Sequence, residues 1–280
     1  MDKKAIELIK EALIEDGVDN DITTLNLVSK DKMLTGSFIV KATGVVSGID
    51  VAKEVFKQIN PRIKMEILKA NGTFVNRGDV IATIEGPIRD ILRGERVALN
   101  FLQRMSGIAA TTAKFVQELA GTNCKILDTR KTAPLLRVFE RQAVRDGGGE
   151  NHRFNLSDRV LIKDNHIAAS GSIKDAVSIL RKAVGRGMII EVEVETLDEF
   201  MEALNTSADV IMLDNMSNEV MKKCVELNEG KKKLEASGNM ELKKVRSVAL
   251  LGVDYISVGS LTHSYKALDI SLKFRKSNFR

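Results

Sequence analysis

The sequence has few aromatic residues and no tryptophan: Phe, Tyr and Trp make up 4% of its 280 residues. Aliphatic side chains must therefore fill most of the core, and a content of 44% hydrophobic and 29% charged residues is ordinary for a soluble globular protein. The two cysteines, Cys124 and Cys224, give no basis for a disulfide framework. The length suits one large domain or two smaller ones.

Long apolar segments are absent as well. Residues 1–13 alternate charged and apolar residues at helical spacing, so we expect no secretory signal there. No stretch of the chain reaches the length of a membrane span. The sequence therefore predicts a cytoplasmic protein that has no membrane partner.

The charge balance is mildly basic, with a formal net charge of +5. Surfaces that bind nucleic acid usually combine basic runs with interleaved aromatic residues. The one obvious basic run, residues 231–233, stands alone before an apolar, strand-like segment. We therefore expect no nucleic-acid partner and favour small anions as the ligands of this basic protein.

Residues 1–112 predict a domain that mixes helices and strands. Ile6, Ile9 and Leu13 lie at helical spacing, on one face of an N-terminal helix. Short strand-like runs, punctuated by glycines, follow at residues 37–42, 45–47, 64–70 and 80–85. A long helical segment at residues 93–119 links this domain to the next, and we expect Gly107 to bend that helix or to pack closely against a neighbour.

After residue 112 the pattern changes to alternating strands and helices. Apolar runs that predict strands occupy residues 126–127, 160–162, 189–194, 210–213, 234–236 and 255–258. Helical segments lie between most of them, at residues 173–184, 197–204, 219–227 and 241–251. This alternation predicts βαβ units and a barrel of parallel strands, in which a seventh or eighth strand is left open. The irregular segment 137–157 is either a long loop or a broken pair of helices.

Polar residues follow the predicted strands directly, where barrel enzymes have their active sites. The cations Arg130, Lys131, Arg153 and Lys163 are placed at successive strand ends. Arginine offers a planar fork that matches a carboxylate or phosphate, and lysine offers a compact point charge. We therefore expect these four residues to share an anionic ligand.

The last two predicted strands end in small residues, Ser237-Gly238-Asn239 after one and Gly259-Ser260 after the other. Many barrels bind phosphate between these two loops, because glycines let backbone amides approach the oxygens and a helix N-terminus adds a favourable dipole. We therefore predict a phosphate site here rather than two ordinary turns.

Carboxylates alternate along the third predicted strand as Glu191, Glu193 and Glu195. All three point to one face, where they must line a polar cavity or pair with cations. Glu193 and Asp214 suit Mg²⁺ that is held together with substrate phosphates. His152 and His166, in contrast, lack the spacing and the nearby cysteines of a zinc site.

Eight segments, in chain order, closely resemble the quinolinate phosphoribosyltransferase family: RGERVALNFLQRMSGIA, DTRKT, GGGENHRFNLSD, LIKDNHI, EVEVE, IMLDN, EASGN and ISVGSLTHS. The family is also called nicotinate-nucleotide pyrophosphorylase (carboxylating). The resemblance covers nearly the whole chain, from EDGVDNDITT to the final strand loop. As a set the motifs are specific, although no single one is decisive.

The resemblance implies an α/β protein: an N-terminal open-faced α/β sandwich over residues 1–112, then an incomplete, TIM-like α/β barrel over residues 113–268, with residues 269–280 returning to the first domain. It also implies a homodimer, with a hexamer left open, in which the first domain of one subunit covers the barrel mouth of the other. Arg104, on a helix otherwise spaced for burial, would then reach the partner subunit's site.

The reaction implied by the resemblance is transfer of phosphoribose from phosphoribosyl pyrophosphate to the ring nitrogen of quinolinate, with loss of CO₂ and pyrophosphate. Lys131, Glu193 and Asp214 are then the catalytic residues, and the two carboxylates bind Mg²⁺ directly or indirectly. The other substrate-binding residues implied are Arg104, Thr129, Arg130, His152, Arg153, Lys163, Ser237, Gly238, Asn239, Gly259 and Ser260.

Two other functions stay open at this point. Lys163 at a strand end is also where a Schiff-base lyase would hold its amine nucleophile, although such an amine usually lies in a less polar pocket. The other alternative is a non-catalytic, anion-binding paralogue that keeps the motifs. Nicotinate, which has one carboxylate, matches so many cations less well than quinolinate does.

Overall fold

The computed structural model describes residues 1–30 and 32–274, which form two compact units. The first unit holds the described residues of 1–113, 133–148 and 264–274, and the second holds 114–132 and 149–263. Residues 133–148 and 264–268, which we expected in the barrel, thus group with the first unit. The end of the predicted C-terminal return, residues 275–280, lies outside the described residues.

The first unit is built around a four-stranded antiparallel sheet in the order β12-β1-β5-β3. Its strands are β1 (Met33–Val40), β3 (Lys64–Ile67), β5 (Val80–Pro87) and β12 (Ile270–Phe274), and β2 (Gly44–Val45) pairs separately with β4 (Phe74–Val75). Its helices are α1 (Lys3–Glu15), the 3₁₀ turn η1 (Val18–Asn20), α2 (Ile22–Leu27), α3 (Ile49–Ile59) and α5 (Arg137–Asp146). The long helix α4 (Ile88–Glu118) begins in this unit and continues into the second.

Alternating burial along β1 explains how the sheet of the first unit packs. Every second residue of β1 is buried, as expected for a strand that covers a core with one face. Phe38 of β1 packs edge-on against Phe56 of α3, with ring centroids 6.2 Å apart. Ile9 and Leu13 of α1 are buried as predicted, and Ile6 is half-buried.

Close packing inside the first unit also explains Gly107 and the position of α5. A Cβ atom added to Gly107 would lie 2.4 Å from the backbone oxygen of Lys266, so a larger residue does not fit there. Phe139 of α5 packs on Phe101 of α4, with ring centroids 4.8 Å apart. The irregular segment 137–157 consists of one helix, α5, followed by a loop, so it is neither the single long loop nor the broken pair of helices that we expected.

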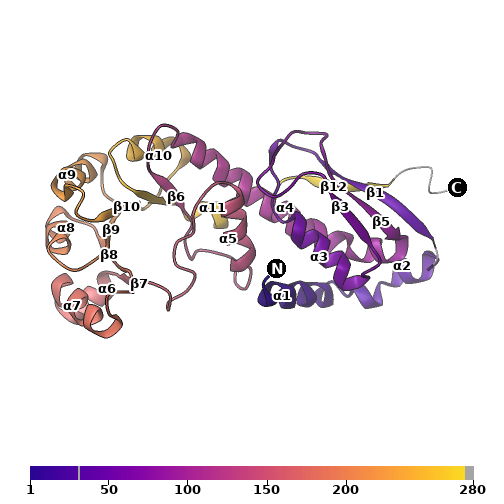
Figure 1. The fold of residues 1–280 in the computed structure, drawn as a ribbon, viewed down its shortest axis with the longest axis horizontal. Coiled ribbons are helices and arrows are strands. Elements are labelled where there is room, and N and C mark those ends of the chain that lie inside the picture. The colour runs from indigo at the N-terminus through magenta and orange to yellow at the C-terminus, as the bar shows by residue number, and fades with distance from the viewer. Residues whose placement is uncertain (31, 275–280) are drawn as a thin grey trace. The chain divides into compact units, whose positions relative to one another are not determined.

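The second unit is a six-stranded parallel sheet in the order β6-β11-β10-β9-β8-β7. Its strands are β6 (Lys125–Leu127), β7 (Val160–Ile162), β8 (Ile190–Val194), β9 (Val210–Asp214), β10 (Lys233–Ser237) and β11 (Tyr255–Ser257). Its helices are α6 (Asp164–Ser170), α7 (Ile173–Val184), α8 (Leu197–Leu204), α9 (Asn218–Asn228), α10 (Leu242–Ala249) and α11 (Ser260–His263). Helices α7 to α10 lie on the outer side of the curved sheet (Figure 1).

The predicted α/β barrel is confirmed, with all six strands in the predicted positions. Among the described residues no seventh strand joins this sheet, so β6 and β7 remain its edges and the barrel is incomplete. The described helices include none that is both long and apolar enough to cross a membrane.

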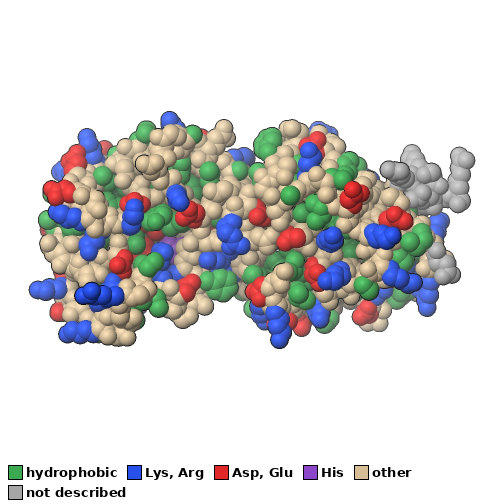
Figure 2. All heavy atoms as spheres, viewed as in Figure 1, with side chains coloured by type: hydrophobic (Ala, Val, Ile, Leu, Met, Phe, Trp, Pro, Cys, Tyr) green, Lys and Arg blue, Asp and Glu red, His purple; other side chains and the backbone are tan. Residues whose placement is uncertain are grey.

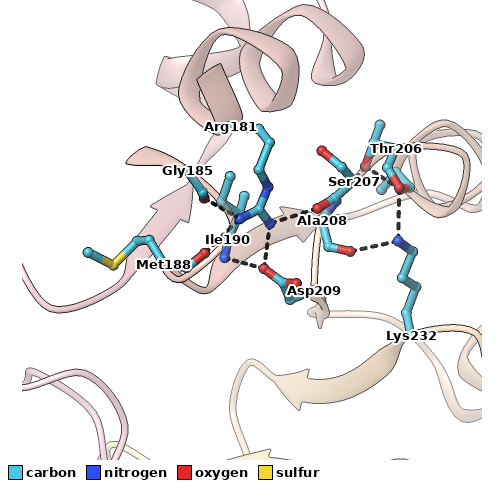
Figure 3. A network of polar contacts seen from close by, with 10 residues as sticks. Arg181, Gly185, Met188, Ile190, Thr206, Ser207, Ala208, Asp209 and Lys232 are labelled. Carbon is cyan, nitrogen blue, oxygen red and sulfur yellow. Dashed lines mark hydrogen bonds and ion pairs between the residues drawn. The ribbon is translucent and has the colours of Figure 1, made fainter. Parts of the chain in front are cut away.

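A network of hydrogen bonds joins the residues at the amino-terminal ends of β8 and β9 (Figure 3). The Arg181 guanidinium donates to the backbone oxygens of Gly185, Met188 and Ser207 at 2.8–2.9 Å, and to Asp209 Oδ2 at 2.6 Å. Lys232 Nζ donates to two further backbone oxygens of the loop that precedes β9. The fold itself binds both of these cations, so this edge is structural and the opposite edge carries the candidate site.

Candidate active site

A cavity of about 410 Å³ lies at the carboxyl ends of the parallel strands of the second unit. Nine residues predicted for the site line it: Thr129, Arg130, Lys131, His152, Arg153, Lys163, Glu193, Asp214 and Ser237. They come from the ends of β6, β7, β8, β9 and β10 or from the loop before β7. Parallel strands place all their carboxyl ends at one edge of a sheet, and this is why residues so far apart in sequence meet here.

Four cations line this cavity, and we call them the cationic wall: Arg130, Lys131, Arg153 and Lys163. Burial, followed by repulsion from Arg130, lowers the pKa of the Arg153 guanidinium. The Arg153 side chain is held in part by its own loop, since Nη1 donates to the backbone oxygen of Arg159 at 3.3 Å. Two guanidinium groups that repel each other at the side of a cavity create a strong electrostatic preference for an anion.

Glu193 and Asp214 lie in the same cavity as the four cations. Glu193 Oε2 accepts a hydrogen bond from Lys163 Nζ at 2.5 Å, and Asp214 Oδ2 accepts one from Asn215 Nδ2 at 2.6 Å. Carboxylate oxygens are the hard ligands that Mg²⁺ prefers, and each carboxylate keeps further lone pairs for an ion. The donor set at these two residues therefore fits Mg²⁺ bound together with a phosphate-bearing ligand.

A second cavity, of about 540 Å³, adjoins the first because five residues line both: Thr129, Lys131, Asp214, Ser237 and Ser257. It contains all the residues predicted for the phosphate: Ser237, Gly238, Asn239, Gly259 and Ser260. The loop that begins at Ser237 precedes α10, which starts at Leu242, so the Ser-Gly-Asn segment is loop rather than the first turn of the helix we expected.

Glycine is required at position 238 of this loop. Gly238 has φ +93°, and an added Cβ would lie 2.3 Å from Asn215 Oδ1. The loop after β11 is fixed to the loop after β6, because Thr262 Oγ1 donates to the backbone oxygen of Lys131 at 2.9 Å. The second cavity therefore includes small residues of two loops that are held at a defined separation from Lys131, as a phosphate site needs.

Beneath the first cavity lies a buried polar cluster of His152, Glu191 and Glu235. His152 Nε2 is 2.9 Å from Glu191 Oε2 and 3.6 Å from Glu235 Oε2. Although burial opposes it, the hydrogen bond from His152 lowers the pKa of Glu191, and burial together with the charge of Glu191 raises the pKa of Glu235 well above its ordinary value. The expectation that Glu191 pairs with a cation is confirmed, since Arg159 Nη1 lies 3.5 Å from its Oε2.

Arg104 is the one predicted site residue that lines neither cavity. It belongs to the first unit, where Nε donates to Glu140 Oε1 at 3.0 Å and the guanidinium lies 5.1 Å from the ring centroid of Tyr265. Glu140 is fully buried, and its second oxygen accepts the backbone N–H of Ala133. Arg104 is thus held in a fixed orientation while its side chain stays 27% exposed.

Glu235 and His263 are among the cavity-lining residues that sequence reasoning did not single out. The sequence did contain a signal for Glu235. It lies in the apolar strand segment Lys233–Ser237, two positions before Ser237, and alternate residues of a strand share a face. His263 follows Gly259 by four residues and ends α11.

On the face drawn in Figure 2, blue and red side chains mix over the surface, so the cationic wall is a local feature.

Comparison with known proteins identifies the family. The model of the quinolinate phosphoribosyl transferase C-terminal domain matches residues 108–273, and that of the N-terminal domain matches residues 21–106. A probable nicotinate-nucleotide pyrophosphorylase (carboxylating) of Bacillus subtilis is 41% identical over 272 residues, covering 97% of this chain and 94% of its own.

Solved structures agree with the family models. NadC of Streptococcus pyogenes has a TM-score of 0.92 at 41% identity, covering 96% of each chain. The nicotinate-nucleotide pyrophosphorylase of Francisella tularensis has a TM-score of 0.91 at 39% identity, covering 97% of this chain and 96% of its own.

Proposed function

The chain belongs to the quinolinate phosphoribosyltransferase family, and from this premise we infer that it transfers phosphoribose from phosphoribosyl pyrophosphate to quinolinate. The reaction releases CO₂ and pyrophosphate and forms nicotinate mononucleotide for NAD biosynthesis. One observation carries this function at the level of residues: a cavity with a cationic wall adjoins a cavity of small, glycine-containing loops. The first suits a dianion and the second a phosphate.

Quinolinate is proposed to bind along the cationic wall. Its two carboxylates would accept charge-assisted hydrogen bonds from Arg130, Arg153 and Lys163, and Thr129 and His152 would contribute polar contacts. An uncharged or singly charged acid would leave part of this positive charge uncompensated. The wall therefore favours quinolinate over nicotinate.

The phosphoribosyl donor is proposed to span both cavities. Its 5′-phosphate would lie between the loop of Ser237, Gly238 and Asn239 and the loop of Gly259 and Ser260. Its ribose hydroxyls would face Glu193 and Asp214, directly or through Mg²⁺, which when bound neutralises charge on the departing pyrophosphate. Lys131 lines both cavities and would face the same pyrophosphate.

Catalysis in this arrangement needs no protein nucleophile. The ring nitrogen forms a bond to the anomeric carbon as the bond from that carbon to pyrophosphate breaks, and Glu193 and Asp214 stabilise the positive charge that develops there. The alkylated ring then accepts the electron pair left by the departing CO₂, and a proton takes its place on the ring carbon. The protein contributes positioning and electrostatic stabilisation.

Arg104 is proposed to serve the quinolinate site of a second subunit in a homodimer, with higher assemblies left open. This role is supported by the Arg104 guanidinium, which Glu140 and Tyr265 hold in a fixed and partly exposed position. A cytoplasmic location also stays a prediction.

The Schiff-base alternative is disfavoured by a specific contact. An amine nucleophile must present a free lone pair, whereas Lys163 is in an ion pair with Glu193 at 2.5 Å. Borohydride trapping with a carbonyl substrate should therefore leave Lys163 unmodified.

The test of the function is direct. The protein is incubated with phosphoribosyl pyrophosphate, Mg²⁺ and quinolinate, and nicotinate mononucleotide and CO₂ are quantified. We expect both products in equal amounts. Turnover of nicotinate but not of quinolinate would overturn the substrate, and quinolinate binding without any turnover would identify a non-catalytic paralogue.

A further inference from the structure

His152 is held from three directions beneath the cationic wall. Its backbone N–H donates to Asp128 Oδ1 at 2.7 Å, its Nδ1 accepts the backbone N–H of Arg153 at 2.8 Å, and its Nε2 lies 2.9 Å from Glu191 Oε2. A ring nitrogen that accepts an N–H carries no proton of its own. The imidazole is therefore the neutral tautomer with its proton on Nε2, and it donates to Glu191.

Glu191 and Glu235 lie close together, although their positions in the chain differ by 44, from 191 to 235. Both side chains are fully buried, and the carboxyl oxygens that they offer to the cluster lie within 4.8 Å of each other. Two buried carboxyl groups this close together cannot both be charged, so one of them keeps its proton.

The charges around the pair decide which form is stable. On the segment before β7, Arg159 is the guanidinium in ion-pair distance of Glu191, and Arg153 adds a longer-range attraction. Glu235 of β10 feels burial and the negative charge of Glu191. The surroundings therefore favour a charged Glu191, which lies 2.9 Å from His152 Nε2 and 3.5 Å from Arg159 Nη1, beside a neutral Glu235.

We propose that Glu191 and Glu235 are positioning residues for the substrate dianion: a neutral Glu235 donates to the Glu191 carboxylate, and that carboxylate holds His152 and the backbone of Arg153 against the cavity. The proposal rests on the proposed function, because the dianion is quinolinate. The neutral state of Glu235 would matter for binding. His152 and Glu235 both line the cavity, so a second negative charge at Glu235 would repel the substrate's carboxylates.

A metal ion is the competing occupant of the same cluster. One ligand atom from each of the three side chains lies within 4.8 Å of the other two, which is close enough for a shared ion. The Arg159 guanidinium, 3.5 Å from Glu191, and the proton on His152 Nε2 both oppose a dication at this point. The cluster is instead held together by protons.

The first measurement is made without ligand on the wild-type protein. The chain has three histidines, so the imidazole nitrogens are resolvable by ¹⁵N NMR, with His152→Gln identifying the signals. We expect His152 as the neutral tautomer with its proton on Nε2. An imidazolium, a proton on Nδ1, or a stoichiometric divalent metal that is lost in Glu235→Gln would each overturn the proposal. This result is independent of whether quinolinate is the substrate.

The second measurement is quinolinate binding by calorimetry in matched variants. Glu235→Gln keeps an uncharged donor to Glu191, so its affinity should stay within about threefold of wild type, whereas Glu235→Ala should lose about tenfold or more. Glu191→Gln removes the charge that holds His152. It should lose at least as much quinolinate affinity as Glu235→Ala, and it should no longer give the wild-type NMR signal of His152. Glu195→Gln, exposed beyond the end of β8, is the control and should behave as wild type.

Equal losses in Glu235→Gln and Glu235→Ala would show that the pair acts only in packing and would refute the positioning role. Absence of quinolinate binding in the wild type would refute the proposed function instead, while the NMR result would still decide the protonation of the cluster.

Discussion

Lys163 Nζ lies 2.5 Å from Glu193 Oε2, which joins the carboxyl ends of the neighbouring strands β7 and β8 inside the cavity. The Lys163 side chain is 44% exposed and that of Glu193 15%, so water screens the pair and ligands reach both groups. The pair therefore contributes little to stability. In the proposed reaction its two charges would serve different parts of the substrates, the cation a carboxylate and the anion the ribose or Mg²⁺.

Glu193→Gln should lower kcat by about 10²-fold, the usual effect of losing one preorganised electrostatic contact in a transition state. The quinolinate KM should change little, and the free energy of unfolding should change by less than about 1 kcal/mol. Steady-state kinetics and urea unfolding measure these effects. Glu195→Gln is the matched control, and a kcat near the wild-type value in Glu193→Gln would refute the catalytic role.

Arg153→Ala and Arg130→Ala should each weaken quinolinate binding by about tenfold or more, because each loses a charge-assisted hydrogen bond. Calorimetric titration with quinolinate measures the loss. Arg186→Ala removes an exposed cation of the same unit and is the control for net charge. If Arg186→Ala weakens binding as much as the two cavity variants do, the wall has no specific role.

Gly238→Ala should raise the KM for phosphoribosyl pyrophosphate, because the new Cβ would lie 2.3 Å from Asn215 Oδ1 and displace the proposed phosphate loop. Gly171→Ala is a matched control: Gly171 has φ +95°, but an added Cβ there would meet nothing closer than 4.0 Å. Both variants carry the backbone strain of a left-handed position, about 1 kcal/mol. Only Gly238→Ala should change the kinetics, and equal KM values would argue against phosphate at this loop.

Glu235 predicts a pH dependence of stability. Its pKa is raised in the folded protein, by burial and then by the charge of Glu191, so the folded state keeps a proton that the unfolded state releases above its ordinary pKa of 4.5. The free energy of unfolding must then fall as pH rises above 4.5. Glu235→Gln has no such proton, so its Tm relative to wild type should increase from about pH 5 to about pH 8. Parallel Tm curves for the two proteins would contradict the raised pKa.

The strands of the second unit were predictable from the sequence because each is a short apolar run between helical segments. Helix α7 (Ile173–Val184) was predicted with both ends correct, since its amphipathic pattern is strong and Ser172 caps its first turn. The gathering of the four cations and of the two glycine-containing loops at one edge of the sheet was predictable for a related reason. Strand ends gather at one edge of a parallel sheet whatever the order of the strands.

The buried pair of Glu191 and Glu235 was not predictable, because it depends on strand order. The two residues belong to β8 and β10, which meet only through β9 between them. Helix α5 shows the same limit: its place in the first unit depends on the contact of Phe139 with Phe101, 38 residues away by the difference of their numbers. The local sequence pattern predicts a helix or a strand, but long-range packing decides which other elements lie next to it.

Arg104 leads to the last prediction, which tests whether two subunits share a site. Arg104→Ala should lose most activity, as should Glu193→Gln, because the first lacks the proposed cation for the partner and the second lacks a charge in its own cavity. In a hybrid dimer of the two variants, one of the two sites combines an intact barrel cavity with an intact Arg104. Mixing the inactive variants under conditions that exchange subunits should therefore restore up to about a quarter of wild-type activity, since half of randomly exchanged dimers are hybrids with one complete site each. A mixture of Glu193→Gln with Asp214→Asn, both altered in the barrel cavity, is the control and should stay inactive. If the first mixture also stays inactive while subunit exchange is shown by differential labelling, Arg104 acts within its own chain.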